Sequence, residues 1–173
     1  MLFYAKKIWY DYFMKNIIII DMQNGFMCDK NKFLIEKIEN YLKVNHFDNI
    51  FLTKCINDDS SPYTNILKWN GVKSLDEQQF AISIPKGAKI LAKNGYGISF
   101  DNIQILKDMG INEIEICGTD IDACVLAIGF NLFDNNIKPI FIKDLCATSS
   151  KNSSITEYAY TIIKRQFGND SLK

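Results

Sequence analysis

A short apolar strand that turns sharply into a helix constrains the fold of this chain most. Residues 114–128 read IEICGTDIDACVLAI, so an apolar run passes through Gly118 and delivers Cys124 to the start of a helical pattern. Unpaired backbone N–H groups and the positive end of the dipole at a helix start favour a thiolate and can hold an oxyanion. This arrangement is typical of a nucleophile elbow. For the motif taken alone, the alternative is a buried cysteine that packs as a small apolar group.

Two further polar residues stand at the ends of apolar segments. Four isoleucines, Ile17–Ile20, precede Asp21, and a shorter segment ends in Lys93 before two turn glycines. In an open α/β sheet the carboxyl ends of the strands converge on one crevice, so Asp21, Lys93 and Cys124 are predicted to meet there. Taken singly, Asp21 could instead cap a helix and Lys93 could be a solvated lysine beside a turn.

Strand and helix patterns alternate along the chain without a linker or a repeat. The expected strands or extended segments are 17–20, 50–55, 82–85, 90–93, 113–117 and 139–143, and the expected helices are 32–44, 61–70, 102–109, 122–134 and 153–166. Such alternation predicts an α/β fold with a doubly wound, mostly parallel sheet and right-handed crossovers. We expect a single domain over residues 14–173, preceded by an N-terminal extension, residues 1–13.

Composition excludes several classes of function. The chain has 173 residues with 20 basic and 20 acidic side chains, and no basic cluster that predicts a nucleic-acid partner. Residues 1–13 mix aromatic and charged side chains, which is typical of neither a signal peptide nor a membrane span. The five cysteines are odd in number and lack CxxC spacing, so we expect free thiols in a reducing cytoplasm.

Three motifs, in order along the chain, resemble those of the isochorismatase-like cysteine hydrolases, the superfamily of nicotinamidases and carbamoylsarcosine amidases. They are DMQNGF from Asp21, KNGYGISF from Lys93 and GTDIDACV from Gly118, and the similarity extends over roughly residues 14–168. The resemblance implies the three-layer αβα fold of this family, here with a six-stranded, mostly parallel sheet.

The resemblance also implies a role for each motif residue. Cys124 would be the nucleophile, Asp21 the base that takes its proton, and Lys93 the group that orients the pair. The helix start and the ammonium group are expected to lower the thiol pKa. In the family the peptide bond that here joins Thr119 to Asp120 is cis, and the amides of Asp120 and Cys124 would form the oxyanion hole.

Other residues are expected to line or support this site. Asp120 and Asp122 flank the cysteine and are assigned to the turn or to the helix cap. The candidates for the substrate pocket are Gln23, Phe26, Trp69 and Tyr96, with core packing as an equal alternative for the aromatic side chains.

The sequence resembles the metal-free branch of the family. Its one histidine, His46, has no second imidazole to share a metal with, and Asp58 and Asp59 are better explained by a turn before Pro62 than by a cation site. We therefore expect no metal and no organic cofactor.

Together these features favour a cysteine hydrolase that cleaves a C–N bond in a small non-peptide amide or carbamoyl compound through an acyl-enzyme on Cys124. One alternative is a silent or redox-responsive protein in which Cys28, Cys117 or Cys146 resolves an oxidised Cys124. Another is a vinyl-ether hydrolase of the isochorismatase type, which generally lacks this cysteine. The expected partners are a small-molecule substrate and further copies of the chain, as a dimer or a tetramer.

Overall fold

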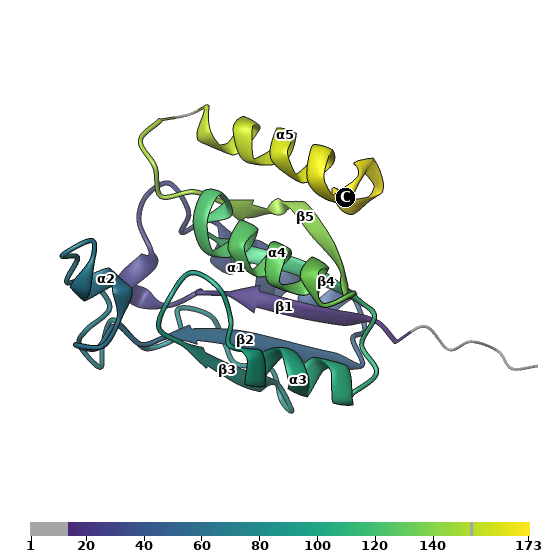
Figure 1. The fold of residues 1–173 in the computed structure, drawn as a ribbon, viewed down its shortest axis with the longest axis horizontal. Helices are drawn as coiled ribbons and strands as arrows, with labels where there is room; N and C mark the ends of the chain where they lie inside the picture. The colour runs from purple at the N-terminus through teal and green to yellow at the C-terminus, as the bar shows by residue number, and fades with distance from the viewer. Residues whose placement is uncertain (1–13, 153) are drawn as a thin grey trace, which may run out of the picture.

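Five parallel strands form the centre of the molecule (Figure 1). In this computed structural model, which describes residues 14–152 and 154–173, they lie side by side in the order β3-β2-β1-β4-β5, and all four pairings are parallel. The strands are β1 (Asn16–Ile20), β2 (Asn49–Cys55), β3 (Lys89–Lys93), β4 (Glu113–Thr119) and β5 (Lys138–Ala147). The predicted extension, residues 1–13, lies outside the described residues.

Helices cover both faces of the sheet, which confirms the predicted three-layer αβα fold (Figure 1). One face carries α1, and the other carries α3, α4 and α5. None of the helices in the described part of the chain is long and apolar enough to cross a membrane. The helices are α1 (Leu34–Val44), α2 (Pro62–Asn65), α3 (Phe100–Asp108), α4 (Leu126–Asp134) and α5 (Ile155–Phe167).

The run of isoleucines in β1 is explained by burial on both faces of the sheet. Ile17 and Ile19 pack in the core layer beneath α1, whereas Ile18 and Ile20 pack in the layer beneath the other three helices. Side chains alternate between the faces of a strand, so a strand covered on both sides needs apolar residues throughout.

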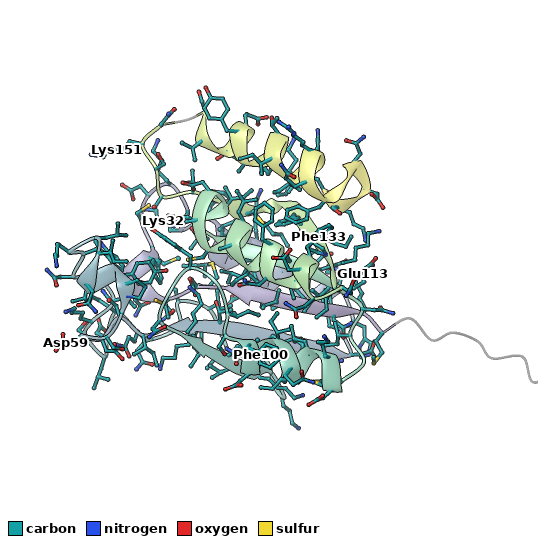
Figure 2. The ribbon with its side chains drawn as sticks, in the orientation of Figure 1. Lys32, Asp59, Phe100, Glu113, Phe133 and Lys151 are labelled. Carbon is teal, nitrogen blue, oxygen red and sulfur yellow. The ribbon has the colours of Figure 1, made fainter. Side chains whose placement is uncertain are left out.

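The order of the strands creates a crevice beside β1. From β1 the chain moves outward to β2 and β3, and then crosses to the other side of β1 to form β4 and β5. Ligands of open α/β sheets bind at such a switch point, outside the carboxyl ends of the strands. Figure 2 marks the two ends of the sheet, because Glu113 begins β4 at one end and Asp59 follows β2 at the other.

Three expected elements differ in the structure. The sheet has five strands, not six, and the segment 82–85 is not one of them, because the backbone N–H of Ser83 donates to the side chain of Glu39 instead of to a strand. The helix expected over 61–70 ends at Asn65, and Lys68 adopts a left-handed φ of 55°. The helix expected to begin at 122 is preceded by a π-helical turn, Ile121–Val125. Residue 153, the expected start of the last helix, lies outside the described residues.

Candidate active site

Asp21, Lys93 and Cys124 meet at the carboxyl edge of the sheet. Lys93 Nζ lies 2.7 Å from Asp21 Oδ2 and 3.4 Å from Cys124 Sγ. The Asp21 and Lys93 side chains are 0% and 1% exposed, and Cys124 is 4% exposed. One ammonium group therefore contacts both the carboxylate and the thiol in a place that excludes bulk water.

The ends of three strands position these groups. Asp21 directly follows β1 with a left-handed φ of 51°, Lys93 is the last residue of β3, and Cys124 lies in the π-helical turn after β4. At Gly118 a Cβ atom would lie 2.1 Å from the carbonyl oxygen of Ile20, and φ is 120°. Only glycine permits this close approach of β4 to β1, which brings the cysteine turn next to Asp21.

The carboxylate of Asp21 has one oxygen fixed and one available. The Thr53 hydroxyl donates to Oδ1 at 2.6 Å and accepts from the backbone N–H of Asp21 at 2.9 Å. Among the described residues, no donor makes a hydrogen bond of standard geometry to Oδ2, although Lys93 Nζ forms a close ion pair with it. Oδ2 is therefore the oxygen that can accept a proton.

The pKa of the Cys124 thiol differs from the sequence-based expectation. Burial raises this pKa well above its ordinary value, the charge of Asp21 raises it further, and the opposing effect of Lys93 is smaller. The expectation of a lowered thiol pKa was wrong, because depth of burial and a buried carboxylate outweigh one ammonium group. Burial thus favours the neutral thiol over the thiolate at Cys124.

Burial alone would lower the pKa of Lys93, but the charge of Asp21 opposes it and the pKa is raised. The ammonium form is therefore the stable one, and Lys93 also donates to the carbonyl oxygen of Gly95 at 2.8 Å. A lysine held charged in this way acts through its charge rather than as a base.

The turn between β4 and α4 is braced by side chains. The Thr119–Asp120 peptide bond is cis. Thr119 is buried and its hydroxyl accepts from Asn31 at 3.1 Å and donates to the Asp120 carboxylate. Asp120 also accepts from the backbone N–H and the hydroxyl of Ser149. Thr119 thus supports the turn from within, whereas Asp120 lies at the surface of the site.

Two residues that the sequence analysis did not single out contact the site. The Tyr63 hydroxyl lies 3.6 Å from Cys124 Sγ, and Thr53 holds Asp21. Tyr63 belongs to α2, where the Ser61 hydroxyl accepts from its backbone N–H after Pro62 has begun the helix. The Ser-Pro pair is a recognisable helix start, but nothing in the sequence indicates that this short helix packs above the cysteine.

A cavity of about 480 Å³ opens over Cys124. Three of the four predicted pocket residues, Phe26, Trp69 and Tyr96, line it. Gln23 does not, because its buried side-chain amide pairs with both backbone groups of Cys55, at 2.7 and 3.0 Å, and holds the loop after β1 to β2. The full lining is Phe26, Tyr63, Leu67, Trp69, Tyr96, Asp120, Asp122, Ala123, Cys124 and Ser149.

The residues around the site do not fit a metal centre. Among residues 14–152 and 154–173, no three His, Cys, Asp or Glu side chains are grouped so that they could hold an ion. His46 lies between α1 and β2, at the opposite edge of the sheet from Cys124. Asp58 accepts from the backbone N–H and the hydroxyl of Ser60, as in a turn. The expectation of a metal-free site stays a prediction.

The buried thiols predict that the protein loses stability in alkali. Burial raises the pKa of Cys55 and of Cys146 from 9.0 to about 12. Above pH 9 the unfolded chain therefore releases protons that the folded chain still binds, so the free energy of unfolding falls as pH rises. We expect the urea midpoint to fall between about pH 9 and 12, and to fall less in Cys146→Val. The raised pKa of the buried thiols would be contradicted if the urea midpoint stayed constant over this pH range. It would also be contradicted if the midpoint fell equally steeply with pH in Cys146→Val.

Comparison with solved structures gives the same fold. An isochorismatase-like hydrolase from Alkaliphilus metalliredigens is 19% identical, with a TM-score of 0.74 over 88% of this chain and 91% of that chain. The pyrazinamidase of Pyrococcus horikoshii, solved in complex with zinc, is 18% identical, with a TM-score of 0.75 over 92% and 97%. The N-carbamoylsarcosine amidase from Thermoplasma acidophilum is 19% identical, with a TM-score of 0.71 over 90% and 93%.

Sequence comparison identifies the family. No curated protein sequence matches this chain. The isochorismatase domain matches residues 15–169, which include all five strands and the three residues that meet at their ends. The chain therefore belongs to the isochorismatase family of hydrolases.

Proposed function

We propose that the protein is a cysteine amidohydrolase that cleaves the C–N bond of a small non-peptide amide or carbamoyl compound. The observation that carries this proposal is the contact of Lys93 Nζ with both Cys124 Sγ and Asp21 Oδ2 at the base of a cavity. A buried thiol beside a carboxylate and an ammonium group combines a nucleophile, a proton acceptor and a fixed positive charge. Two of the structures that share the fold are named as amidases, which agrees with this chemistry.

In the first half of the reaction, the Cys124 sulfur attacks the carbonyl carbon of the amide. The thiol proton passes to Asp21 Oδ2, so the new C–S bond forms without a free thiolate in the resting site. Lys93 stabilises the negative charge as it moves between the two groups. The backbone N–H groups of Asp120 and Cys124 are the proposed donors to the oxyanion.

In the second half, the tetrahedral intermediate collapses and the C–N bond breaks. Asp21 returns the proton to the nitrogen, which leaves as ammonia or an amine, and a thioester remains on Cys124. Water then attacks the thioester while Asp21 accepts a proton from it, and the Cys124 thiolate leaves and is reprotonated. The net reaction consumes one water and gives a carboxylic acid and an amine.

An assay for ammonia release tests this proposal. The purified protein is incubated with a panel of primary amides, ureas and carbamoyl compounds and with a vinyl ether, and the same protein is analysed by mass spectrometry after peroxide treatment. We expect release of ammonia from at least one compound, and no peroxide-induced disulfide between Cys124 and Cys28, Cys117 or Cys146. Disulfide formation without hydrolysis would favour the redox-responsive alternative. Cleavage of a vinyl ether without cleavage of any amide would favour the isochorismatase type of reaction.

A further inference from the structure

The cavity above Cys124 has aromatic walls. Phe26 and Trp69 stack with ring centroids 5.8 Å apart, and Tyr63 meets both Trp69 and Tyr96 edge to face, at 5.6 and 5.1 Å. These contacts join the four rings into one continuous wall. Aromatic faces attract cations through their quadrupole, so such a wall suits either a flat apolar group or a positively charged one.

The charged residues that line the cavity favour a positively charged ligand over a flat apolar one. Asp120 and Asp122 are its two charged lining residues, and no lysine or arginine is among the described residues that line it. The Thr148 hydroxyl donates to Asp122 Oδ1 at 2.5 Å. Asp122 is exposed and lies two residues before the thiol. Asp122 and Cys124 line the same cavity.

Lys93 and a group of four other lysines lie outside the lining of this cavity. Lys93 lies beneath the thiol and is paired with Asp21, so the two together contribute no net charge. Four other lysines line a separate cavity of about 340 Å³ between α1 and the segment that leads into α5, and this cavity shares no lining residue with the first. They are Lys30, Lys37, Lys143 and Lys151, the last of which is labelled in Figure 2.

We propose that the substrate is an amide that also carries a protonated amine. The amine would lie between the aromatic wall and Asp122, with the amide carbonyl at Cys124 Sγ. This inference rests on the proposed amidohydrolase function and specifies its substrate class. An anionic amide would place its charge against two carboxylates, whereas a neutral aromatic amide would contact the aromatic rings but form no ion pair with Asp122.

Three benzamides of similar size test the inference: 4-(aminomethyl)benzamide, 4-(hydroxymethyl)benzamide and 4-carboxybenzamide, which are cationic, neutral and anionic near neutral pH. We expect kcat/KM for ammonia release to be about 10-fold higher for the cationic compound than for the neutral one, and lowest for the anionic one. Asp122→Asn should lower kcat/KM for the cationic compound about 5- to 10-fold more than for the neutral one. Asp134→Asn, at the far end of α4, is the matched control and should change neither.

Measurements of binding show whether the inferred substrate class or the proposed hydrolase function is the part that fails. The affinities of the three compounds are measured by calorimetry with Cys124→Ala, which does not depend on turnover. If no amide is hydrolysed but the cationic compound binds best and loses affinity in Asp122→Asn, the function fails and the ligand class stands. If amides are hydrolysed with the neutral or anionic compound preferred, or if Asp122→Asn affects the cationic and neutral compounds equally, the inference is overturned and the function stands.

Discussion

Replacing Cys124 by alanine is expected to reduce amide hydrolysis by at least about 10³-fold, because it removes the proposed nucleophile. The thiol is small and lies at the boundary between the core and the cavity, so the alanine side chain fits without a clash. The effect should therefore appear in kcat and not in the amount of folded protein. The measurement is ammonia release at saturating amide, together with the thermal midpoint of each variant.

Cys28→Ser provides the matched control for this prediction. Cys28 is a free, half-buried thiol that lies outside the lining of the catalytic cavity, so its replacement should leave turnover within about twofold of the unaltered protein. Full activity of Cys124→Ala, matching that of Cys28→Ser, would exclude Cys124 as the nucleophile. An equal loss in both variants would point to a general requirement for thiols instead.

Replacing Lys93 by methionine is expected to destabilise the fold by about 3–5 kcal/mol as well as to abolish activity, because it leaves the fully buried carboxylate of Asp21 without its charge partner. Met has a similar length and is apolar, so lost packing contributes little. The loss is measured as a shift of the urea unfolding midpoint at constant slope.

A double variant shows whether the loss of stability in Lys93→Met arises from the unpaired charge of Asp21. Asp21→Asn combined with Lys93→Met removes both charges, so it should recover a large part of the lost stability while remaining inactive. Lys138→Met breaks an exposed pair with Asp170, 2.9 Å long, and should cost far less stability than Lys93→Met. If Lys93→Met costs no more than Lys138→Met, or if the double variant is less stable than Lys93→Met, the buried ion pair does not have the role assigned to it.

The sequence predicted the architecture of the fold because its signals are local. The four isoleucines of β1 predicted a buried strand, and the apolar run through Gly118 predicted the strand that leads to Cys124. That Gly118 also permits the close approach of β4 to β1 appears only in the structure. The number of strands was less predictable. Whether the segment 82–85 joins the sheet depends on a hydrogen bond from Ser83 to Glu39 in another element, which no local pattern records.

The candidate site was likewise predictable only in part. Strand ends place Asp21, Lys93 and Cys124 together, and this follows from the parallel topology. The direction of the thiol pKa was predicted wrongly, because it depends on depth of burial, which appears only after folding. Gln23 was assigned to the pocket because it lies in a motif next to Asp21, but its amide matches the backbone groups of Cys55 in the neighbouring strand.

The most direct test of the central claim is the mass of the protein during turnover. The protein is mixed with a p-nitrophenyl ester of the best amide's acyl group, whose better leaving group favours build-up of the acyl-enzyme, and acid stops the reaction within seconds. We expect the mass of the protein to increase by one acyl group, located on the peptide that contains Cys124 and released by hydroxylamine. Absence of this adduct while the amide is being hydrolysed, or its appearance on another cysteine, would contradict the claim that Cys124 is the nucleophile.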